Sequence, residues 1–378
     1  MASRIKKKIL VLGVGAAQTD FIEYCNKRGF EVHSCSYENK GRGKDLSHYF
    51  SVIDIRNLRE LNNYVKKQNI DIIYSIGSDI ALPAVTTISK IHNLPLFNSP
   101  ATIAVCNNKI KLRNALKSIR EYSIEAAEVR NESDLESWTI FPAVIKPGDN
   151  QGQRGVREVY NKDQLSGAFR AAIRNSPSRT AIIEEYVDGF EISLNLYVVD
   201  GVITFQFITE RISFTEFPGG IIKKHIFPVT QKLDEEKISE MSDSVIQTLG
   251  IQNGPVYLQV KIDRKGDPKI IEVAPRLDGC HIWRLINSLT GINLFDIILN
   301  HLIDGRIDPD IFKRQQPENG RMAELTFFTS PPHRTFHIKE FKAVNDAVYT
   351  EWYYREGETV KPINGFAEKV GYQILTQK

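Results

Sequence analysis

The segment from Val256 to Arg276 restricts the fold of this chain more than any other stretch, because two apolar runs flank a short polar turn. The runs VYLQVKI and PKIIEVA have the patterns of buried strands, and the turn residues RKGD at 264–267 separate them. This arrangement predicts a β-hairpin.

Two polar side chains, Gln259 and Glu272, interrupt the two arms of the predicted hairpin. A carboxylate inside an apolar strand is unfavourable unless it is paired, hydrogen-bonded or bound to a cation. Glu272 is therefore a candidate magnesium ligand, and the nearby Arg276 is a candidate anion-binding residue. The alternative is an edge strand on which Glu272 faces water.

The composition excludes several classes of protein. The length of 378 residues allows two or three domains, and 42% hydrophobic with 25% charged residues is typical of a globular protein. A net charge of +3 with dispersed basic residues argues against nucleic acid as a partner. We expect no membrane span and no secretory signal, because the apolar run at 9–12 is too short for either. The four cysteines lack CxxC or CxxH spacing, which favours reduced thiols in a cytoplasmic protein.

The first hundred residues alternate between strand and helix patterns, which predicts a parallel, doubly wound sheet. Gly13 and Gly15 resemble the start of a dinucleotide-binding turn, but Gln18 stands where the third glycine of that motif would be. Packing of a tight turn therefore explains the two glycines as well as a cofactor does. Asp79 follows another predicted strand, where such sheets bind ligands, although we favour a helix N-cap for it.

Two cationic segments follow. Residues 101–119 predict a helix broken at 107–108 that carries Lys109 and Arg113, and such cations usually face solvent. The segment FPAVIKPGDNQGQRGVREV then predicts a strand ending at Lys146, a glycine loop and a second strand. Glycines allow backbone N–H groups to approach anionic oxygens, and lysine adds a positive charge. A phosphate-binding loop and a hairpin without a ligand are both compatible with this pattern.

The segment AIIEEYVDGFEISLNLYVVDG predicts strands with acidic residues at their edges. Backbone groups beside Tyr186 and Val187 could bind the edge of a purine, and a carboxylate a few residues later could bind ribose hydroxyls. Each feature alone is compatible with an ordinary strand.

In this order the motifs resemble the ATP-grasp superfamily, specifically the carboxylate-amine ligases related to biotin carboxylase and to each half of carbamoyl phosphate synthetase. The resemblance covers nearly the whole chain through NKIKLRNAL, VIKPGDNQGQRGV, IIEEYVDGFE and LQVKIDRKGDPKIIEVAPR. It implies that ATP is bound by two lysines, the glycine loop, an adenine hinge, a ribose acid and an amide: Lys109, Lys146, Gly152, Glu184, Glu185, Tyr186, Val187, Glu191 and Gln259. It implies magnesium, or manganese in its place, on Glu272 and Gln259, and catalytic roles for Arg276, Glu272 and Lys146. Ala274 departs from the family, which commonly has asparagine there, and alanine cannot coordinate a metal.

The resemblance also implies a mixed α/β and α+β fold. An N-terminal doubly wound parallel sheet (1–100) would precede a two-lobed ATP-grasp domain (101–305) with a mobile lid lobe at about 120–190. A C-terminal β-rich segment (306–378) would pack on the ATP-grasp lobe.

The expected reaction is ATP-dependent activation of a carboxylate as an acyl phosphate, followed by attack of an amine to give an amide. Arg211, Asp278 and His281 are candidate contacts for the small-molecule carboxylate or amine, whose identities the sequence leaves open. The alternatives are a carboxylase or phosphoribosyl-type ligase of primary metabolism, and an ATP-binding protein without catalysis. Homodimerisation is compatible with the resemblance.

Overall fold

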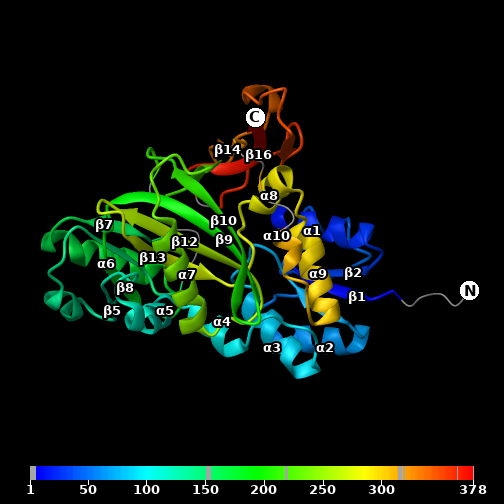
Figure 1. Cartoon of the computed structure of the whole chain (residues 1–378), viewed down its shortest axis with the longest axis horizontal. Coiled ribbons are helices and arrows are strands. Elements are labelled where there is room, and N and C mark those ends of the chain that lie inside the picture. The colour runs from blue at the N-terminus through cyan, green and yellow to red at the C-terminus, as the bar shows by residue number, and fades with distance from the viewer. Residues whose placement is uncertain are drawn as a thin grey trace, which may run out of the picture.

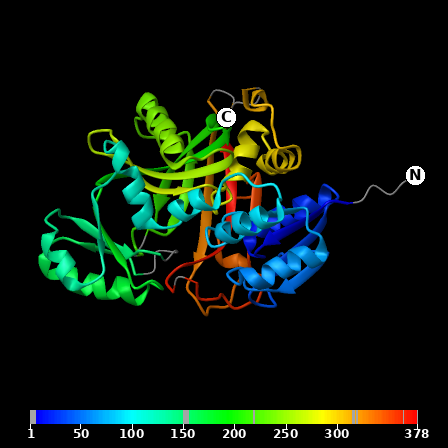
Figure 2. The ribbon, with the colours of Figure 1, turned by 90° about the horizontal axis from the view of Figure 1, so that it is seen from below.

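The computed structural model describes residues 6–149, 155–217, 220–313, 317, 320–363 and 365–377. An N-terminal sheet and a small four-stranded lobe lie at opposite ends of the molecule, with a large sheet between them (Figures 1 and 2). The fold class expected from the sequence is confirmed.

The N-terminal domain is a parallel sheet in the order β3-β2-β1-β4. Its strands are β1 (Lys8–Leu12), β2 (Glu31–Ser36), β3 (Tyr49–Val52) and β4 (Ile72–Tyr74), and its helices are α1 (Ala16–Lys27), α2 (Leu58–Gln68) and α3 (Leu82–His92). Alternate residues of β1 face opposite cores, because Ile9 and Val11 pack with α1 while Leu10 and Leu12 pack with α2 and α3. Helices thus cover both faces of the sheet, as in other doubly wound folds.

The turn between β1 and α1 is closed by a side chain. Gly13 has a φ of +100°, and the Gln18 side chain accepts a hydrogen bond from the Gly15 N–H at 3.0 Å. A Cβ atom on Gly13 would lie 3.3 Å from the Gln18 side chain. Gln18 therefore covers the surface on which a dinucleotide would rest, which accounts for the two glycines through turn packing.

A helical connection leads to the small lobe. The break predicted at residues 107–108 is confirmed, because α4 (Pro100–Cys106) ends there and α5 (Lys109–Leu116) begins, followed by the short helix η1 (Lys117–Ile119). The Asn108 side chain accepts a hydrogen bond from the Lys111 N–H at 3.0 Å and caps α5. The cap fixes Lys109 at the first position of the helix.

The small lobe is an antiparallel sheet in the order β5-β8-β6-β7, covered by helix α6. Its elements are β5 (Ala126–Val129), η2 (Glu132–Ser137), β6 (Ala143–Pro147), β7 (Arg157–Val159), η3 (Lys162–Gln164), α6 (Leu165–Arg174) and β8 (Ala181–Glu185). The strand predicted to end near Lys146 is therefore present, and the loop after it reaches β7 through residues 150–154, which lie outside the described residues.

The large sheet has the order β13-β12-β9-β10-β11-β14-β16-β15. Its strands are β9 (Gly189–Val199), β10 (Val202–Ser213), β11 (Ile222–Phe227), β12 (Gly254–Asp263), β13 (Pro268–Ala274), β14 (Met322–Ser330), β15 (Tyr349–Trp352) and β16 (Glu368–Gln377). The predicted hairpin is confirmed as the antiparallel pair β12 and β13. The C-terminal strands join this sheet through the pairing of β11 with β14, so they continue the sheet itself.

The two faces of the large sheet carry different side chains. One face is apolar, and Leu194 and Leu258 pack there against α7 (Glu235–Leu249). The other face is apolar only near α8 (Ile282–Thr290) and α9 (Leu294–Asp304). Toward the small lobe it carries polar and charged side chains, among them Glu191, Arg211 and Gln259. The short helices α10 (Asp310–Lys313) and η4 (Ile338–Glu340) complete the structure.

Within the described part of the chain, no single helix is long and apolar enough to cross a membrane. Helices α8 and α9 reach that length and composition only as a pair, bent by 101°.

Candidate active site

Glu272 and Gln259 lie directly opposite each other on β13 and β12. Opposed residues of antiparallel strands share one face of the sheet, with Cβ atoms about 5 Å apart. The Glu272 side chain is 46% exposed, so it faces solvent from the sheet surface. The protein atoms around the carboxylate keep water away from part of it, and this desolvation raises the pKa of Glu272. The nearby Asp79 carboxylate raises the pKa further, although Arg276 and Lys109 oppose the shift.

These two residues fit a hard divalent ion. Gln259 donates a hydrogen bond from its side-chain nitrogen to Glu191 at 3.0 Å, which leaves the amide oxygen as an available ligand atom. A carboxylate and an amide oxygen are typical ligands of Mg²⁺ and Mn²⁺. Ala274, two residues after Glu272, is 2% exposed, and its cross-strand neighbour is Tyr257. It supplies no ligand atom, so substrate or water would have to complete the coordination of a bound ion.

Lys109 lies near this carboxylate and near a second lysine from another element. Lys109 begins α5 and Lys146 lies in β6, and Lys109 interacts electrostatically with Lys146, Glu272 and Glu184. Burial and the positive charge of Lys146 lower the pKa of Lys109. A polyanionic ligand such as a triphosphate would relieve the repulsion between the two ammonium groups.

Glu184 holds Lys146 in place. Its carboxylate is 2% exposed, accepts a hydrogen bond from the Arg113 Nε at 2.8 Å and forms an ion pair with Lys146. Burial alone would raise the pKa of Glu184, but the two cations outweigh it and lower the pKa to about 2. Arg113 also donates to the backbone oxygens of Ile270 and Ile271 at 2.8 and 2.7 Å, which ties α5 to β13. The Glu184 side chain thus positions Lys146, and only its backbone remains for the predicted adenine hinge.

The predicted hinge connects β8 to β9, between the two lobes. The Glu185 and Tyr186 N–H groups donate to Glu125 and Pro142 at 2.9 and 3.0 Å. Among the described residues, no group accepts a hydrogen bond from the Val187 N–H. Lys261 donates to the Val187 oxygen at 3.0 Å and lies 4.6 Å above the Tyr186 ring centroid. Val187 therefore keeps a backbone donor available on an anchored segment.

Glu191, predicted to bind ribose, lies between two other predicted site residues. Its carboxylate accepts hydrogen bonds from Gln259 and from Arg211, which is 7% exposed. Arg211 faces Glu191 across β9 and β10. The structure thus brings Arg211, Glu191, Gln259 and Glu272 together on one face of the large sheet.

Arg276 is held by the N-terminal domain. Its guanidinium donates two hydrogen bonds of 2.6 Å to the two carboxylate oxygens of Asp79, and it lies 3.8 Å from Glu272. The N-cap interpretation of Asp79 is wrong, because Ala81 is the N-cap of α3 and no side chain caps this helix. A bidentate pair of hydrogen bonds between a guanidinium and a carboxylate fixes the orientation of the guanidinium. Asp79 was missed as a partner because the two residues are 197 positions apart.

The loops that carry Asp79 and Arg276 touch through two glycines. Gly77 has a φ of +62°, and a Cβ atom on it would lie 2.8 Å from the Gly279 Cα. We expect Gly77→Ala to lower the free energy of unfolding by about 2 to 3 kcal/mol, because it adds a backbone clash to left-handed strain. Gly250→Ala is the matched control, since Gly250 has a φ of +60° with no atom within 4 Å of its Cβ position. Equal losses in the two variants, measured by denaturant unfolding, would contradict the close contact.

The remaining predicted substrate residues differ in their surroundings. Asp278 is 5% exposed, and one carboxylate oxygen accepts the Cys280 N–H at 3.1 Å. His281 is 2% exposed; its Nδ1 lies 3.1 Å from Asp20 and its Nε2 lies 2.8 Å from the Tyr353 hydroxyl. Both ring nitrogens of His281 are occupied, so it joins the N-terminal and C-terminal parts of the protein and presents no group to a substrate. Gly152 lies outside the described residues.

Lys369 of β16 is a residue that the sequence did not suggest. Its ammonium lies 3.6 Å from the Cys280 Sγ and 3.5 Å from the Phe327 ring centroid. The alternation of β16 predicts which face Lys369 occupies, but no local pattern predicts contact with a loop 89 residues earlier. All four cysteines are buried and unpaired, as expected.

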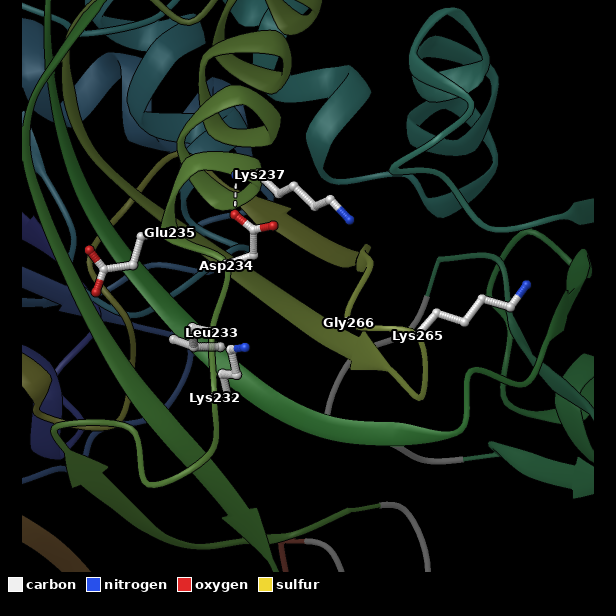
Figure 3. Close-up of a pocket in the computed structure, with 7 residues that line it drawn as sticks. All are labelled: Lys232, Leu233, Asp234, Glu235, Lys237, Lys265 and Gly266. Atoms are coloured by element: carbon white, nitrogen blue, oxygen red, sulfur yellow. Dashed lines mark hydrogen bonds between the residues drawn. The ribbon is translucent and has the colours of Figure 1, made fainter.

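A surface hollow of about 530 Å³ lies away from these residues, between the start of α7 and the turn of the β12–β13 hairpin (Figure 3). Two of its charged side chains are already engaged, because Asp234 caps α7 and Lys237 forms an ion pair with Asp267 at 2.8 Å. It is a poor candidate for a catalytic site.

Residues 139–283 match the family model of the ATP-grasp domain. Formate-dependent phosphoribosylglycinamide formyltransferase of Prochlorococcus marinus (strain NATL2A) is 30% identical over 200 residues, which cover 51% of this chain and 51% of that protein. The chain thus spans about half the length of this curated relative.

Two solved structures share the whole fold. An L-amino acid ligase from Bacillus licheniformis superposes with a TM-score of 0.78 at 18% identity, covering 99% of this chain and 94% of that one. The biotin carboxylase domain dimer of Hydrogenobacter thermophilus 2-oxoglutarate carboxylase, in complex with MgADP and bicarbonate, gives 0.78 at 13% identity, covering 99% and 86%. At these identities the likeness establishes the fold.

Proposed function

We propose that this chain, which contains an ATP-grasp domain over residues 139–283, is an ATP-dependent ligase that joins a carboxylate to an amine. The observation that carries the proposal is the half-exposed carboxylate of Glu272 opposite Gln259, with Lys109 near both Glu272 and Lys146. Cationic side chains next to a metal-binding carboxylate can together bind the terminal phosphates of a nucleotide.

The proposed roles follow from the contacts. Lys109 and Lys146 bind the phosphates, and the backbone of Glu184 to Val187 holds the adenine, with Val187 supplying the available N–H. Glu191 binds the ribose through the carboxylate that Arg211 and Gln259 orient. Glu272 and Gln259 would hold magnesium or manganese, which neutralises charge on the phosphates. Gly152 is proposed to belong to the loop that covers them.

The proposed chemistry has two steps. A substrate carboxylate oxygen attacks the γ-phosphorus, the bond to the bridging oxygen breaks, and ADP leaves with that electron pair. An amine nitrogen then attacks the acyl carbon, phosphate leaves, and the amine proton is lost to solvent or phosphate. Arg276, oriented by Asp79, stabilises the oxyanion of the tetrahedral intermediate.

A specific finding also favours a second candidate. The Prochlorococcus relative is named as a formate-dependent phosphoribosylglycinamide formyltransferase, so a phosphoribosyl-type ligase that activates formate is the alternative. A carboxylase would activate bicarbonate instead, and an ATP-binding protein without catalysis would activate neither. We also propose a cytoplasmic location for the protein, in accord with its four unpaired cysteines, and assembly as a homodimer.

A screen of ADP release distinguishes these candidates. We expect full-length protein with MgATP to release ADP only when a carboxylic acid is present, and to form an amide when an amine is added. Amino acids and sugar acids form the main panel, and MnATP should substitute at least in part. Release with formate or bicarbonate alone would favour the second candidate or a carboxylase. Tight ATP binding without turnover on any pair would contradict a ligase.

A further inference from the structure

Beside the proposed nucleotide site, three buried polar atoms have no hydrogen-bond partner in the part of the chain that the structure describes. They are the Arg211 Nε, the His225 Nε2 and one carboxylate oxygen of Asp278. The three residues are only 7%, 0% and 5% exposed. Each unpaired buried polar atom is unfavourable, so three in one place indicate a ligand that completes them.

These atoms surround a common volume. The His225 Nε2, an Asp278 carboxylate oxygen and the Cys280 Sγ lie within 4.8 Å of one another. Arg211 is the cross-strand neighbour of His225 on β10 and β11 and interacts electrostatically with Asp278 and Cys280. Lys369 approaches from β16, 3.6 Å from the Cys280 Sγ. Lys369 forms no ion pair with any described carboxylate, so its charge is also available.

A histidine, a carboxylate and a thiol could also bind zinc, but the geometry opposes it. Tetrahedral zinc with these ligands requires ligand atoms about 3.3 to 3.6 Å apart, whereas the His225 Nε2 and the Asp278 oxygen are 4.0 Å apart. A hydrogen-bonding atom about 2.8 to 3.0 Å from each can span that separation. Lys369 and Arg211 would also repel a cation. A thiolate ligand is disfavoured as well, because burial raises the pKa of Cys280 to about 11.

The hydrogen-bonding groups around this volume include both donors and acceptors. Arg211 and Lys369 are cationic donors, whereas the Asp278 oxygen is an anionic acceptor. Burial and the charges of Arg211 and Lys369 lower the pKa of His225 well below its usual value, so the ring is neutral and offers one hydrogen-bonding nitrogen. A simple anion would satisfy only the donors, and an amine only the acceptor. A small group with both charges satisfies all of them.

We propose that this cluster binds the α-ammonium and α-carboxylate of an amino-acid substrate. Asp278 accepts from the ammonium, and Arg211 with Lys369 donates to the carboxylate. The inference rests on the proposed ligase function and specifies its substrate class. Arg211 also contacts Glu191, which connects this cluster to the proposed nucleotide site. A phosphoribosyl substrate, with no ammonium next to a carboxylate, would leave Asp278 unsatisfied.

Binding measurements test the proposal without requiring turnover. Full-length protein with Mg²⁺ and a nonhydrolysable ATP analogue is titrated calorimetrically with each of the twenty common L-amino acids. The best of these is then compared with its α-hydroxy acid and with its carboxamide. We expect both analogues to bind about 10- to 100-fold more weakly, since each loses a charged hydrogen bond.

Variants assign the two ends of the ligand. Asp278→Asn should abolish discrimination between the amino acid and the hydroxy acid, while Lys369→Met should abolish discrimination between the acid and the carboxamide, with Lys369→Arg restoring it. Asp243→Asn and Lys342→Met, which change exposed residues of the same types, should leave both ratios unchanged. Because each ratio is measured within one variant, a general loss of stability does not imitate the result.

The outcomes separate this inference from the function on which it rests. Binding of amino acids with these ratios, but no ADP release on any panel, would support the inference and refute the ligase. ADP release with acids that lack an α-ammonium, and no binding of any amino acid, would refute the inference alone. Stoichiometric binding of added ZnCl₂ that Asp278→Asn removes, or ratios that neither variant changes, would also overturn it.

Discussion

Glu272→Gln is expected to slow magnesium-dependent ADP release by roughly 10³-fold, the scale of losing one main electrostatic contact to the transferring group. The substitution keeps the shape of the side chain but removes the charge opposite Gln259. It should also weaken the magnesium dependence of nucleotide-analogue binding. ADP release and analogue binding are measured across a magnesium titration, and excess magnesium should restore part of the rate.

The control for this prediction is Glu136→Gln, an exposed glutamate of the small lobe. Since desolvation and the Asp79 carboxylate raise the pKa of Glu272 in the metal-free protein, protons compete with magnesium there, and at limiting magnesium the rate of the unaltered protein should fall as the pH is lowered. Glu272→Gln should lack this acidic limb. A variant that keeps the full rate, or the same acidic limb, would remove Glu272 from the metal site.

Glu184→Gln is expected to lower the free energy of unfolding by about 3 to 5 kcal/mol at pH 7, because it leaves the buried Arg113 and Lys146 without their shared carboxylate. ATP-analogue binding should weaken as well, since Lys146 loses its orienting partner. Denaturant unfolding, followed through the transition of the small lobe, measures the first effect.

The pH dependence of this effect has a defined sign. The folded-state pKa of Glu184 is lowered to about 2 from 4.5, so its contribution is fully present above pH 4.5 and is lost as the pH falls toward 2. The difference between the variant and the unaltered protein should shrink over that range. Glu128→Gln, which breaks the exposed pair with Arg130 in the same lobe, should change stability little at either pH. Similar behaviour of the two variants would contradict a structural role for Glu184.

The sequence predicted those features that are set by local patterns. The β12–β13 hairpin follows from two apolar runs around a glycine turn, and the helix break at Asn107 and Asn108 follows from capping chemistry. These features depend on residues at most a hairpin apart. The face shared by Gln259 and Glu272 does not follow from strand alternation, which would pair Gln259 with Ile271; a register shift between Gln259 and Val260 pairs it with Glu272 instead.

The roles that the sequence did not predict depend on distant partners. Adjacent glutamates at 184 and 185 look alike in sequence, and only the pairing of β8 with β6 directs Glu184 toward Lys146. Asp79 was assigned to a helix cap because its true partner Arg276 lies 197 positions away, after β13 of another sheet. Lys369 was missed because its partner Cys280 lies in a loop 89 residues earlier. Side chains that connect separate sheets cannot be paired by periodicity alone.

The contact between Gly77 and Gly279 has a consequence for engineering chimaeras. The carboxylate that aims Arg276 belongs to one folding unit, and the guanidinium belongs to another. Grafting the first hundred residues of a homologue onto this chain would replace one side of that contact and keep the other. A working hybrid must therefore exchange both loops as a matched set, although the two residues they orient are separated by 197 positions.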